Sequence, residues 1–328
     1  MRPFVIVNPA AGRGRPVPGL ERGLRDLSRA EVRVTESPGD AARWAREAAR
    51  SGCGPLLLAG GDGLLHEVVN ALVPLSERPL LGLIPTGTGN DFARSLGIPL
   101  LPEPALGLLA GGRTRAVDAV RLRVMEGGRG RRPPAEGGAA PAEQEAVPAE
   151  KRAAPGGEKE VRYMVNVAVT GFAGRVARRT TGTTKRRWGG WAYRRASASE
   201  LLRLSADRTE LEVDGEALRL STYAVAVANG RYVGGGIPLL SEARPDDGWL
   251  DLLVVPALPA AAVAALLPRI LFGRHAGSHR LIVRRARCIR LRAEGGLGLN
   301  VDGENVDAGA VEFELLPAAL RFLVPPAA

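Results

Sequence analysis

The sequence predicts two domains of different fold class, an α/β domain followed by an antiparallel β domain. The chain has 328 residues, which is long enough for two hydrophobic cores. Up to about residue 117, short apolar runs alternate with helical patterns, an order that favours a parallel sheet covered by helices. Beyond residue 117, strand patterns follow one another with few helices between them, which favours a β-sandwich or barrel.

The first domain is predicted from four strands and the helices between them. Apolar and β-branched runs predict the strands Phe4–Val7, Val32–Thr35, Pro55–Ala59 and Leu80–Ile84. A first helix is predicted from Leu20, Leu24 and Leu27, which are at helical spacing. The alanine-rich segment Ala41–Ala49 predicts another helix, with Asp40 as its expected cap. A further helix is predicted from the apolar face of Leu64, Leu65, Val68, Val69 and Leu72.

The second domain is predicted from strands that turn residues separate. The expected strands are Val117–Val124, Val161–Val169, Leu211–Val213, Tyr223–Ala228, Leu250–Val255, Leu281–Val283, Cys288–Arg292, Leu297–Val301 and Val311–Leu315. Helical patterns occur near Ala196–Leu204 and at Pro259–Leu271. The segment Glu126–Glu160 is rich in Gly, Pro, Ala and charged residues, so we expect a disordered loop, at about 126–160, between two paired strands.

The composition excludes several classes of protein. Cys53 and Cys288 are the only cysteines, which excludes a disulfide scaffold and a multi-cysteine metal site and fits a reducing cytoplasm. The longest apolar stretch is short and contains Pro268 and Arg269, so no transmembrane helix is predicted. With 45 Lys and Arg against 35 Asp and Glu, the net charge is +10, which suits nucleic acid, an anionic membrane or a phosphate-rich ligand.

The segment LLAGGDGLLHEVVNAL, residues 57–72, carries the most informative motif. A buried strand leads into Gly60, Gly61 and Gly63, which surround Asp62 just before a helix. Glycines allow a ligand to approach the main chain closely, and the amides at the start of a helix bind phosphate. A carboxylate there would repel phosphate unless a metal lies between them, so Asp62 indicates Mg²⁺. The alternative is an ordinary strand-to-helix turn with a solvated Asp.

Two further loops have the same character. The loop PTGTGNDF, residues 85–92, follows a predicted strand and supplies hydroxyl and amide donors before another helix. The loop NPAAGRGR, residues 8–15, follows the first strand and adds cations. In a parallel sheet all three loops fall at the carboxyl ends of the strands, where ligands bind. None of them is a Walker A loop or a GxGxxG fingerprint.

These motifs resemble the catalytic domain of diacylglycerol kinases, which bacterial lipid kinases and sphingosine kinases share. GGDG followed by PTGTGNDFAR is the signature of that domain. The resemblance continues through VNVAVTGFAG at 165–174, VANGRYVGGG at 227–236, PDDGWLDLLVV at 245–255 and NVDGE at 300–304. It implies a Rossmann-like α/β nucleotide-binding domain, similar to those of phosphofructokinase and NAD kinase, at 1–117 plus 312–328. An antiparallel β-sandwich at 118–311 would bind the lipid substrate.

The resemblance also implies roles for individual residues. Asp62 matches an acid near Mg²⁺ and the phosphates, Asp302 the general base, Glu304 its acidic neighbour and Asp118 an acid of the same network. From the residues alone, Asp302 and the glycine after it predict a hairpin turn. Asp247 matches a ligand of a structural Mg²⁺, which the main-chain carbonyls of Arg244 and Trp249 would complete. The positions that match ATP contacts are Asn8, Arg13, Gly60, Gly61, Gly63, Thr86, Gly87, Thr88, Gly89 and Asn90.

The implied activity is the ATP- and Mg²⁺-dependent phosphorylation of a lipid hydroxyl, most simply diacylglycerol to phosphatidic acid. The enzyme would be cytoplasmic and peripheral to the inner face of the membrane, and a homodimer is compatible with this activity. Leu64 and His66 depart from the family pattern, which usually has Thr and Asn at these positions. Two alternatives remain open. One is a kinase of a sphingoid base, another lipid alcohol or NAD, and the other is a lipid- or nucleotide-binding protein without turnover.

The segment 175–195 combines basic and aromatic residues. It contains eight Arg and Lys residues and no acid, interleaved with Trp188, Trp191 and Tyr193. Such a composition suits the headgroup region of an anionic membrane. A solvated basic surface and stacking on nucleic acid are the alternatives. We expect membrane contact and no nucleic-acid partner.

His275 and His279 have the spacing of two metal ligands on a helix. Gly273 and Gly277 disfavour a continuous helix there, and no third ligand is evident. We therefore expect a loop with two solvated histidines.

Overall fold

The structure is a computed structural model, and it describes residues 2–14, 19–27, 29–126, 145–146, 157–171, 174, 205–275 and 277–326. The basic and aromatic segment 175–195, the expected helix near Ala196–Leu204 and most of the expected insertion lie outside these residues. Among the described helices, none is both long and apolar enough to cross a membrane.

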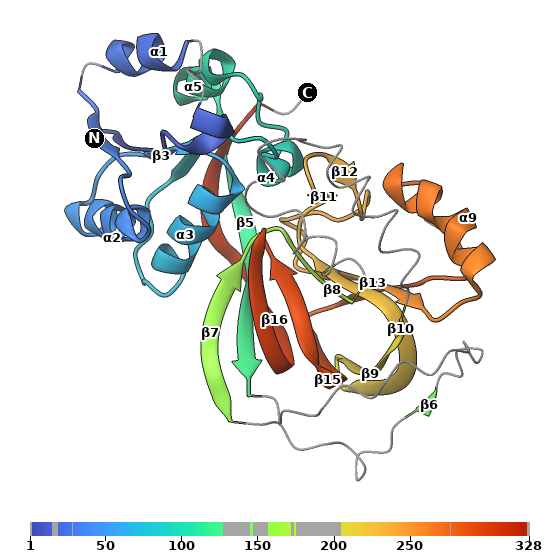
Figure 1. Cartoon of the computed structure of the whole chain (residues 1–328). Helices are drawn as coiled ribbons and strands as arrows, with labels where there is room; N and C mark the ends of the chain where they lie inside the picture. Colours follow the sequence, from blue (N-terminus) through green and yellow to red (C-terminus); the bar gives the residue numbers. More distant parts are fainter. Residues whose placement is uncertain are drawn as a thin grey trace.

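The N-terminal part is a parallel sheet with helices on both faces (Figure 1). Its strands are β1 (Phe4–Val7), β2 (Glu31–Val34), β3 (Leu56–Gly60) and β4 (Leu81–Pro85), in the order β2-β1-β3-β4. Side chains alternate along each strand, so Phe4 and Leu56 pack on one face while Val5 and Leu57 pack on the other. The helical elements are η1 (Ala11–Gly14), α1 (Leu20–Asp26), α2 (Asp40–Ser51), α3 (Asp62–Leu72), α4 (Asp91–Ser95) and α5 (Pro102–Gly111).

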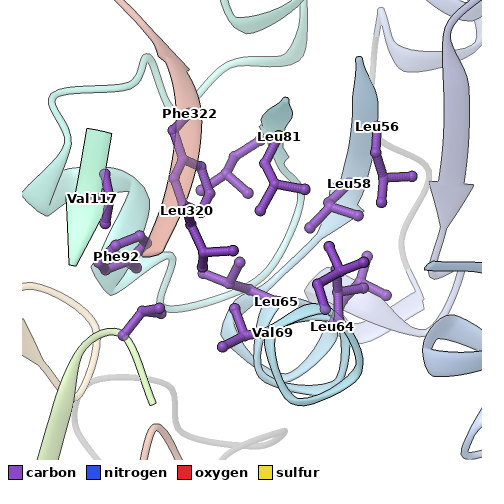
Figure 2. Close-up of a cluster of buried hydrophobic side chains, with 14 of the residues drawn as sticks. Leu56, Leu58, Leu64, Leu65, Val69, Leu81, Phe92, Val117, Leu320 and Phe322 are labelled. Carbon is purple, nitrogen blue, oxygen red and sulfur yellow. The ribbon is translucent and has the colours of Figure 1, made fainter. Parts of the chain in front are cut away.

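Helix α3 packs its apolar face against the sheet directly below the glycine-rich loops. Figure 2 shows Leu64, Leu65 and Val69 of this helix facing the leucines of β3 and β4. Phe92 of α4 meets Phe322 edge to face, with ring centroids 5.6 Å apart. Burial of each such side chain stabilises the fold by about 1.5–3 kcal/mol. The core therefore fixes the start of α3, where the loops of the predicted site lie.

The C-terminal part is built from antiparallel strands that curl around a second core of Val, Leu and Phe side chains. Its main strands are β5 (Arg113–Met125), β7 (Glu158–Met164), β8 (Val167–Gly171), β9 (Asp207–Val213), β10 (Glu216–Ala228), β13 (Leu250–Pro256), β14 (Ile282–Ala286), β15 (Cys288–Val301) and β16 (Glu304–Val324). Shorter strands are β6 (Glu145–Ala146), β11 (Tyr232–Val233) and β12 (Ile237–Pro238), and the helix α9 (Ala260–Leu271) lies near β12. The strands β5 and β7, on either side of the expected insertion, are paired as expected.

Strand β16 joins the two parts. It pairs with β5 and β15 in antiparallel fashion, and Phe322 near its end pairs in parallel with Leu81 of β4. In Figure 1 this red strand runs from the lower sheet up to the parallel strands. The C-terminus thus pairs with the first sheet, and one long strand makes the sheets of the two parts continuous. The domain boundaries at 117 and 312 stay a prediction.

The structure corrects several local expectations. The expected strand Val161–Val169 is interrupted by a turn at 165–166, whereas the two strands expected between Cys288 and Val301 form one strand with an irregular register. Gly39, not Asp40, is the N-cap of α2. The carboxylate of Asp40 instead accepts hydrogen bonds from the amides of the preceding turn, which lower its pKa. His275 is 3% exposed, so it is not the solvated residue that was expected.

Candidate active site

The three glycine-rich loops meet at one edge of the parallel sheet. They follow β1, β3 and β4, whose carboxyl ends lie together because the strands are parallel. A Cβ added to Gly87 would lie 2.5 Å from Cα of Gly61, and one added to Gly12 would lie 2.3 Å from the carbonyl oxygen of Thr86. Only glycine allows this approach, so main chain contacts main chain. A small pocket lies beside these contacts, lined in part by Gly60, Asp62 and Asn90.

Asn90 holds the PTGTGN loop in its shape. It adopts a left-handed conformation with φ 53°, which Asn tolerates better than most residues. Its Oδ1 accepts a hydrogen bond from the amide of Gly87 at 3.1 Å, and its Nδ2 donates to the carbonyl of Gly87 at 2.9 Å. The loop is thereby closed on itself, with Thr86 buried and Thr88 exposed.

In the first loop, the side chain of Asn8 stabilises the turn that follows β1. Its Oδ1 accepts a hydrogen bond from the amide of Ala10 at 3.0 Å. Arg13 lies on η1, but its side chain is outside the described residues.

Asp62 is the first residue of α3, and its carboxylate faces the PTGTGN loop. Its Oδ1 accepts a hydrogen bond from the amide of Phe92 at 3.3 Å. A Cβ added to Gly89 would lie 2.8 Å from Oδ2 of Asp62 and 3.4 Å from Oδ2 of Asp91, so two carboxylates face the same glycine. Mg²⁺ in nucleotide sites is held by one or two carboxylates together with phosphate oxygens. These residues therefore fit such an ion.

Asp302 forms the predicted hairpin turn, and its carboxylate is buried. Asp302 and Gly303 have positive φ angles of 48° and 98° and connect β15 to β16 as a two-residue hairpin turn. Its side chain is only 4% exposed. The carboxylate accepts hydrogen bonds from the amides of Val165, Asn166 and Val167, at 2.9, 3.1 and 3.0 Å. The interruption between β7 and β8 supplies these three donors.

A second Asp-Gly turn, far from this site, repeats much of the same arrangement. Asp214 and Gly215 also have positive φ angles and connect β9 to β10. The carboxylate of Asp214 accepts hydrogen bonds from the amides of Arg287 and Cys288. Asp302 differs in its neighbour, because His66 of α3 has its Nδ1 atom 3.8 Å from Oδ2 of Asp302. Since His66 follows Asp62 by one helical turn, both lie on the same side of α3. Through His66, Asp302 is thereby near the side of α3 on which Asp62 lies.

The other two predicted acids have different surroundings. Glu304 is exposed at the start of β16. Asp118 is 3% exposed, and its two oxygens accept hydrogen bonds from the amides of Gly248 and Ala318, at 2.9 and 2.7 Å. Ala318 has a positive φ of 49° and lies at the register shift of β16. Asp118 therefore ties β5, β16 and the loop at 245–248 together.

The predicted structural magnesium site contains an arginine. Oδ2 of Asp247 lies 3.3 Å from Nη2 of Arg285, whose Nε donates to Oδ1 of Asp251 at 3.3 Å. The amide of Trp249 donates to the other oxygen of Asp247, and the ring of Trp249 lies under the guanidinium of Arg287. A guanidinium thus supplies positive charge beside Asp247. Among the described residues, no three acidic, His or Cys side chains are placed to hold a metal. The magnesium site of Asp247 with the carbonyls of Arg244 and Trp249 stays a prediction.

Several polar residues that join the two parts were missed by sequence reasoning. Asp91 accepts hydrogen bonds from the amides of Gly235 and Gly236, and Ser95 accepts one from the amide of Arg231. Asn229 is fully buried, and its Nδ2 donates to the carbonyls of Asp118 and Val165. The motifs DFARS and VANG could have indicated these contacts, because each has polar residues next to apolar ones that pack in the core.

Leu64, a departure from the family pattern, lies in the core. It is 3% exposed, and a Cβ added to Gly60 would lie 2.4 Å from its Cδ2 atom. Its side chain packs under β3 (Figure 2). The residue therefore contributes packing in place of the hydroxyl that the family pattern has there.

Two family models match the two parts of the chain. The model of the diacylglycerol kinase catalytic domain matches residues 2–122, and that of the YegS C-terminal NAD kinase beta sandwich-like domain matches residues 166–324. The chain is 33% identical to a probable lipid kinase YegS-like protein of Pseudomonas fluorescens, over 90% of this chain and 85% of that one. It is 29% identical to a protein of the same description from Serratia proteamaculans, over 98% and 94% of the two chains.

Solved structures show the same fold. A crystal structure of a diacylglycerol kinase from Bacillus anthracis is similar with a TM-score of 0.68 and 23% identity, over 99% of this chain and 97% of that one. A second crystal structure from the same bacterium has a TM-score of 0.74 at 23% identity, over 99% and 95% of the two chains. The mixed α/β fold with a C-terminal β-sandwich-like part is thus shared with these proteins.

Proposed function

The chain belongs to the YegS-like lipid kinases, which have a diacylglycerol kinase catalytic domain, and from this premise we propose that it transfers the γ-phosphoryl group of ATP to the hydroxyl of diacylglycerol. The observation that carries the proposal is the meeting of three glycine-rich loops at the amino terminus of α3, with Asp302 on the same side of that helix. In this proposal the main chain of the loops binds phosphate, and the carboxylate of Asp302 accepts a proton.

The phosphates of ATP are proposed to lie over the GGDG and PTGTGN loops. The helix α3 offers main-chain amides and a positive dipole end there, both of which favour phosphate. Gly63 has open space around its Cα, so nothing in the described chain obstructs a phosphate at that point. Asp62 is the residue proposed to hold Mg²⁺, with Asp91 beside it. When bound, the ion offsets the negative charge of the phosphates.

The acceptor hydroxyl is proposed to lose its proton to Asp302. As the proton moves to the carboxylate, the hydroxyl oxygen forms a bond to the γ-phosphorus. The bond from the γ-phosphorus to the bridging oxygen breaks, and ADP leaves with that electron pair. The three amide donors on Asp302 hold its carboxylate in one orientation, which is what a positioned base requires. Glu304 stays a proposed acidic neighbour, whereas the contacts of Asp118 favour a positioning role.

Contact with an anionic membrane is part of the proposal. A lipid acceptor is delivered by a membrane, and the segment 175–195 has the Arg, Trp and Tyr content that suits its surface. The enzyme would then work as a peripheral protein on the cytoplasmic face. The test is binding to vesicles of anionic lipid. Binding that stays unchanged when Arg186, Arg187 and Trp188 become Ala would contradict this contact.

The acceptor is tested by direct product analysis. The purified protein is incubated with ATP labelled at the γ-phosphate, Mg²⁺ and a panel of lipid alcohols in mixed micelles, including diacylglycerol and a sphingoid base. NAD is tested in parallel without lipid. Labelled phosphatidic acid supports the proposal, and a different labelled product redirects it to another acceptor. ATP consumption that no lipid stimulates would refute the proposed lipid kinase activity.

A further inference from the structure

His66 presents a buried nitrogen to the proposed base. Its side chain is 11% exposed, and its Nδ1 atom has no hydrogen-bond partner among the described residues. Oδ2 of Asp302 lies 3.8 Å from Nδ1, which is beyond hydrogen-bond distance. A buried donor or acceptor without a partner is destabilising, so such a group favours any small movement that gives it one.

Asn70 lies beside the other ring nitrogen of His66. Its Oδ1 accepts a hydrogen bond from the amide of Tyr163 at 2.8 Å, and its Nδ2 donates to the carbonyls of Tyr163 and His66 at 2.8 and 2.9 Å. This orientation of the amide is therefore fixed by three contacts. The same Nδ2 lies 3.3 Å from Nε2 of His66.

Both hydrogens of Asn70 Nδ2 are used by the two carbonyls, so its contact with Nε2 does not fix the tautomer of His66. The neighbouring carboxylate favours one tautomer, because a carboxylate only accepts hydrogen bonds and an unprotonated Nδ1 would place two lone pairs against each other. The neutral imidazole with its proton on Nδ1 therefore suits this position, and the orphaned nitrogen is then a donor that faces Asp302. Three of the carboxylate's roughly four acceptor positions are used by main-chain amides, which leaves one for this donor.

We propose that the Nδ1–H group of His66 orients the carboxylate of Asp302 by donating to its Oδ2, which makes His66 a positioning residue for phosphoryl transfer. A movement of about 1 Å brings the two atoms within hydrogen-bond distance. The role rests on the proposed function, since it concerns the base of that reaction. It gives a meaning to the second departure from the family pattern, because Asn at this position also carries a donor.

Kinetics of two variants at position 66 test this role. His66→Leu keeps the volume and removes the donor, whereas His66→Asn keeps a donor. We expect kcat to fall about tenfold or more in His66→Leu, the KM for ATP to stay within about twofold, and His66→Asn to recover most of the loss. In the background of Asp302→Asn, His66→Leu should lower the residual rate by less than about twofold. An equal loss in both backgrounds, or unchanged kcat in His66→Leu at an unchanged melting temperature, would overturn the proposal.

The tautomer of His66 is tested without any activity. The ¹⁵N spectrum of the imidazoles, with the signals of His66 identified by their absence in His66→Asn, distinguishes Nδ1–H from Nε2–H. The proposal requires Nδ1–H, and a shift of the Nδ1 signal in Asp302→Asn. An Nε2–H tautomer contradicts it even if lipid is phosphorylated. Conversely, the absence of any lipid product with the Nδ1–H tautomer present would refute the proposed function and leave the contact to Asp302 standing.

Discussion

Asp302 occupies the first position of a two-residue hairpin turn, and its carboxylate accepts hydrogen bonds from three consecutive main-chain amides. Asp214 has the same backbone conformation, and its carboxylate also accepts hydrogen bonds from two consecutive amides. What separates them is the neighbourhood, since Asp302 lies next to His66 of α3 and Asp214 is exposed near the start of β15. Substitution of Asp214 therefore reports the effect on the stability of such a turn alone, whereas substitution of Asp302 also tests its proposed role as a base.

Asp302→Asn should lower turnover by about a hundred- to ten-thousandfold, because the amide is a far weaker proton acceptor. It should also lower the free energy of unfolding by about 1–3 kcal/mol. The reason is that the new NH₂ group is itself a donor and faces a main-chain amide that loses its acceptor. Asp214→Asn is the matched control, with loss of stability of the same kind and turnover close to wild type. Both are measured by steady-state kinetics and thermal denaturation. Near-wild-type turnover of Asp302→Asn would remove it as the base.

His275 is a buried residue whose protonation opposes folding. Burial lowers its pKa, and hydrogen bonds to the main chain of Arg269 and Leu239 only partly offset this effect. The folded-state pKa therefore lies below the unfolded value of about 6.5. Below that pH the unfolded chain binds the proton first, so this histidine's contribution to stability is full above about pH 6.5 and is lost as the pH falls.

The difference in the free energy of unfolding between wild type and His275→Gln isolates this titration. We expect wild type to lose its advantage over the variant as the pH falls from 7.5 to about 5. Chemical denaturation at a series of pH values measures the difference, in which the effects of His66 and His279 cancel. A difference that stays constant or grows towards acid pH would contradict the direction of the pKa shift.

At the scale of elements, the glycine-rich loops are held by contacts of main chain with main chain. Gly12, Gly61 and Gly87 lie where a side chain would collide with a neighbouring loop. Gly63 is different, because a Cβ there meets nothing within 4 Å. The fold therefore does not require a glycine at position 63. If the phosphates bind at the start of α3, a side chain there would collide with them instead.

Gly63→Ala separates these two requirements. Stability should stay the same or rise by up to about 1 kcal/mol, because Ala favours a helix over Gly, while the KM for ATP rises about tenfold. Gly107→Ala in α5 is the control, since Gly107 is also helical and has open space around it. This control should keep its KM for ATP. Unchanged ATP affinity in Gly63→Ala would place the phosphates elsewhere.

The strands β13 and β14 bring an arginine to the acids of the PDDGWLD motif. Asp251 and Arg285 are direct partners in the register of these strands, and Arg285 also reaches Asp247. Burial raises the pKa of Asp251, and the charge of Arg285 opposes that shift. The guanidinium therefore meets the need for a cation near these carboxylates.

Removal of divalent metal should consequently leave the melting temperature of the ATP-free protein unchanged. Arg285→Met, by contrast, should lower stability by about 1 kcal/mol, because it leaves two carboxylates without their cation. Thermal denaturation with and without a chelator measures both effects. A chelator-induced loss of stability that added Mg²⁺ reverses would instead support a structural magnesium site at Asp247.

At the scale of the whole molecule, β16 connects the two cores. Its first part lies between β15 and β5, and its last residues add to the parallel sheet next to β4. Phe313 lies in the core of the C-terminal part and Phe322 in that of the N-terminal part. Unfolding of either part would strip this strand of half its partners.

The two parts should therefore unfold together. Calorimetry should give a single transition whose calorimetric and van't Hoff enthalpies agree. Two resolved transitions would show that the parts are stable independently, in spite of their shared strand.

The sequence by itself determined the local elements and the phosphate loops. Strands β1, β3 and β4, the start of α3 and the turn at Asp302 were readable because alternation, helical spacing and glycine placement are short-range properties. The motif resemblance named the same acids that the structure places beside α3 and at the junction of β5 with β16.

Only the tertiary structure decided how distant segments complete one another. The register of β14 brings Arg285 to Asp247, the turn at 165–166 supplies donors to Asp302, and α3 carries His66 to the same carboxylate. Likewise, the sequence predicted a short strand at Val311–Leu315 and a return of residues 312–328 to the first domain, whereas the structure has a single strand, β16, over Glu304–Val324. Such pairings depend on contacts between residues far apart in the chain, and no local pattern encodes them.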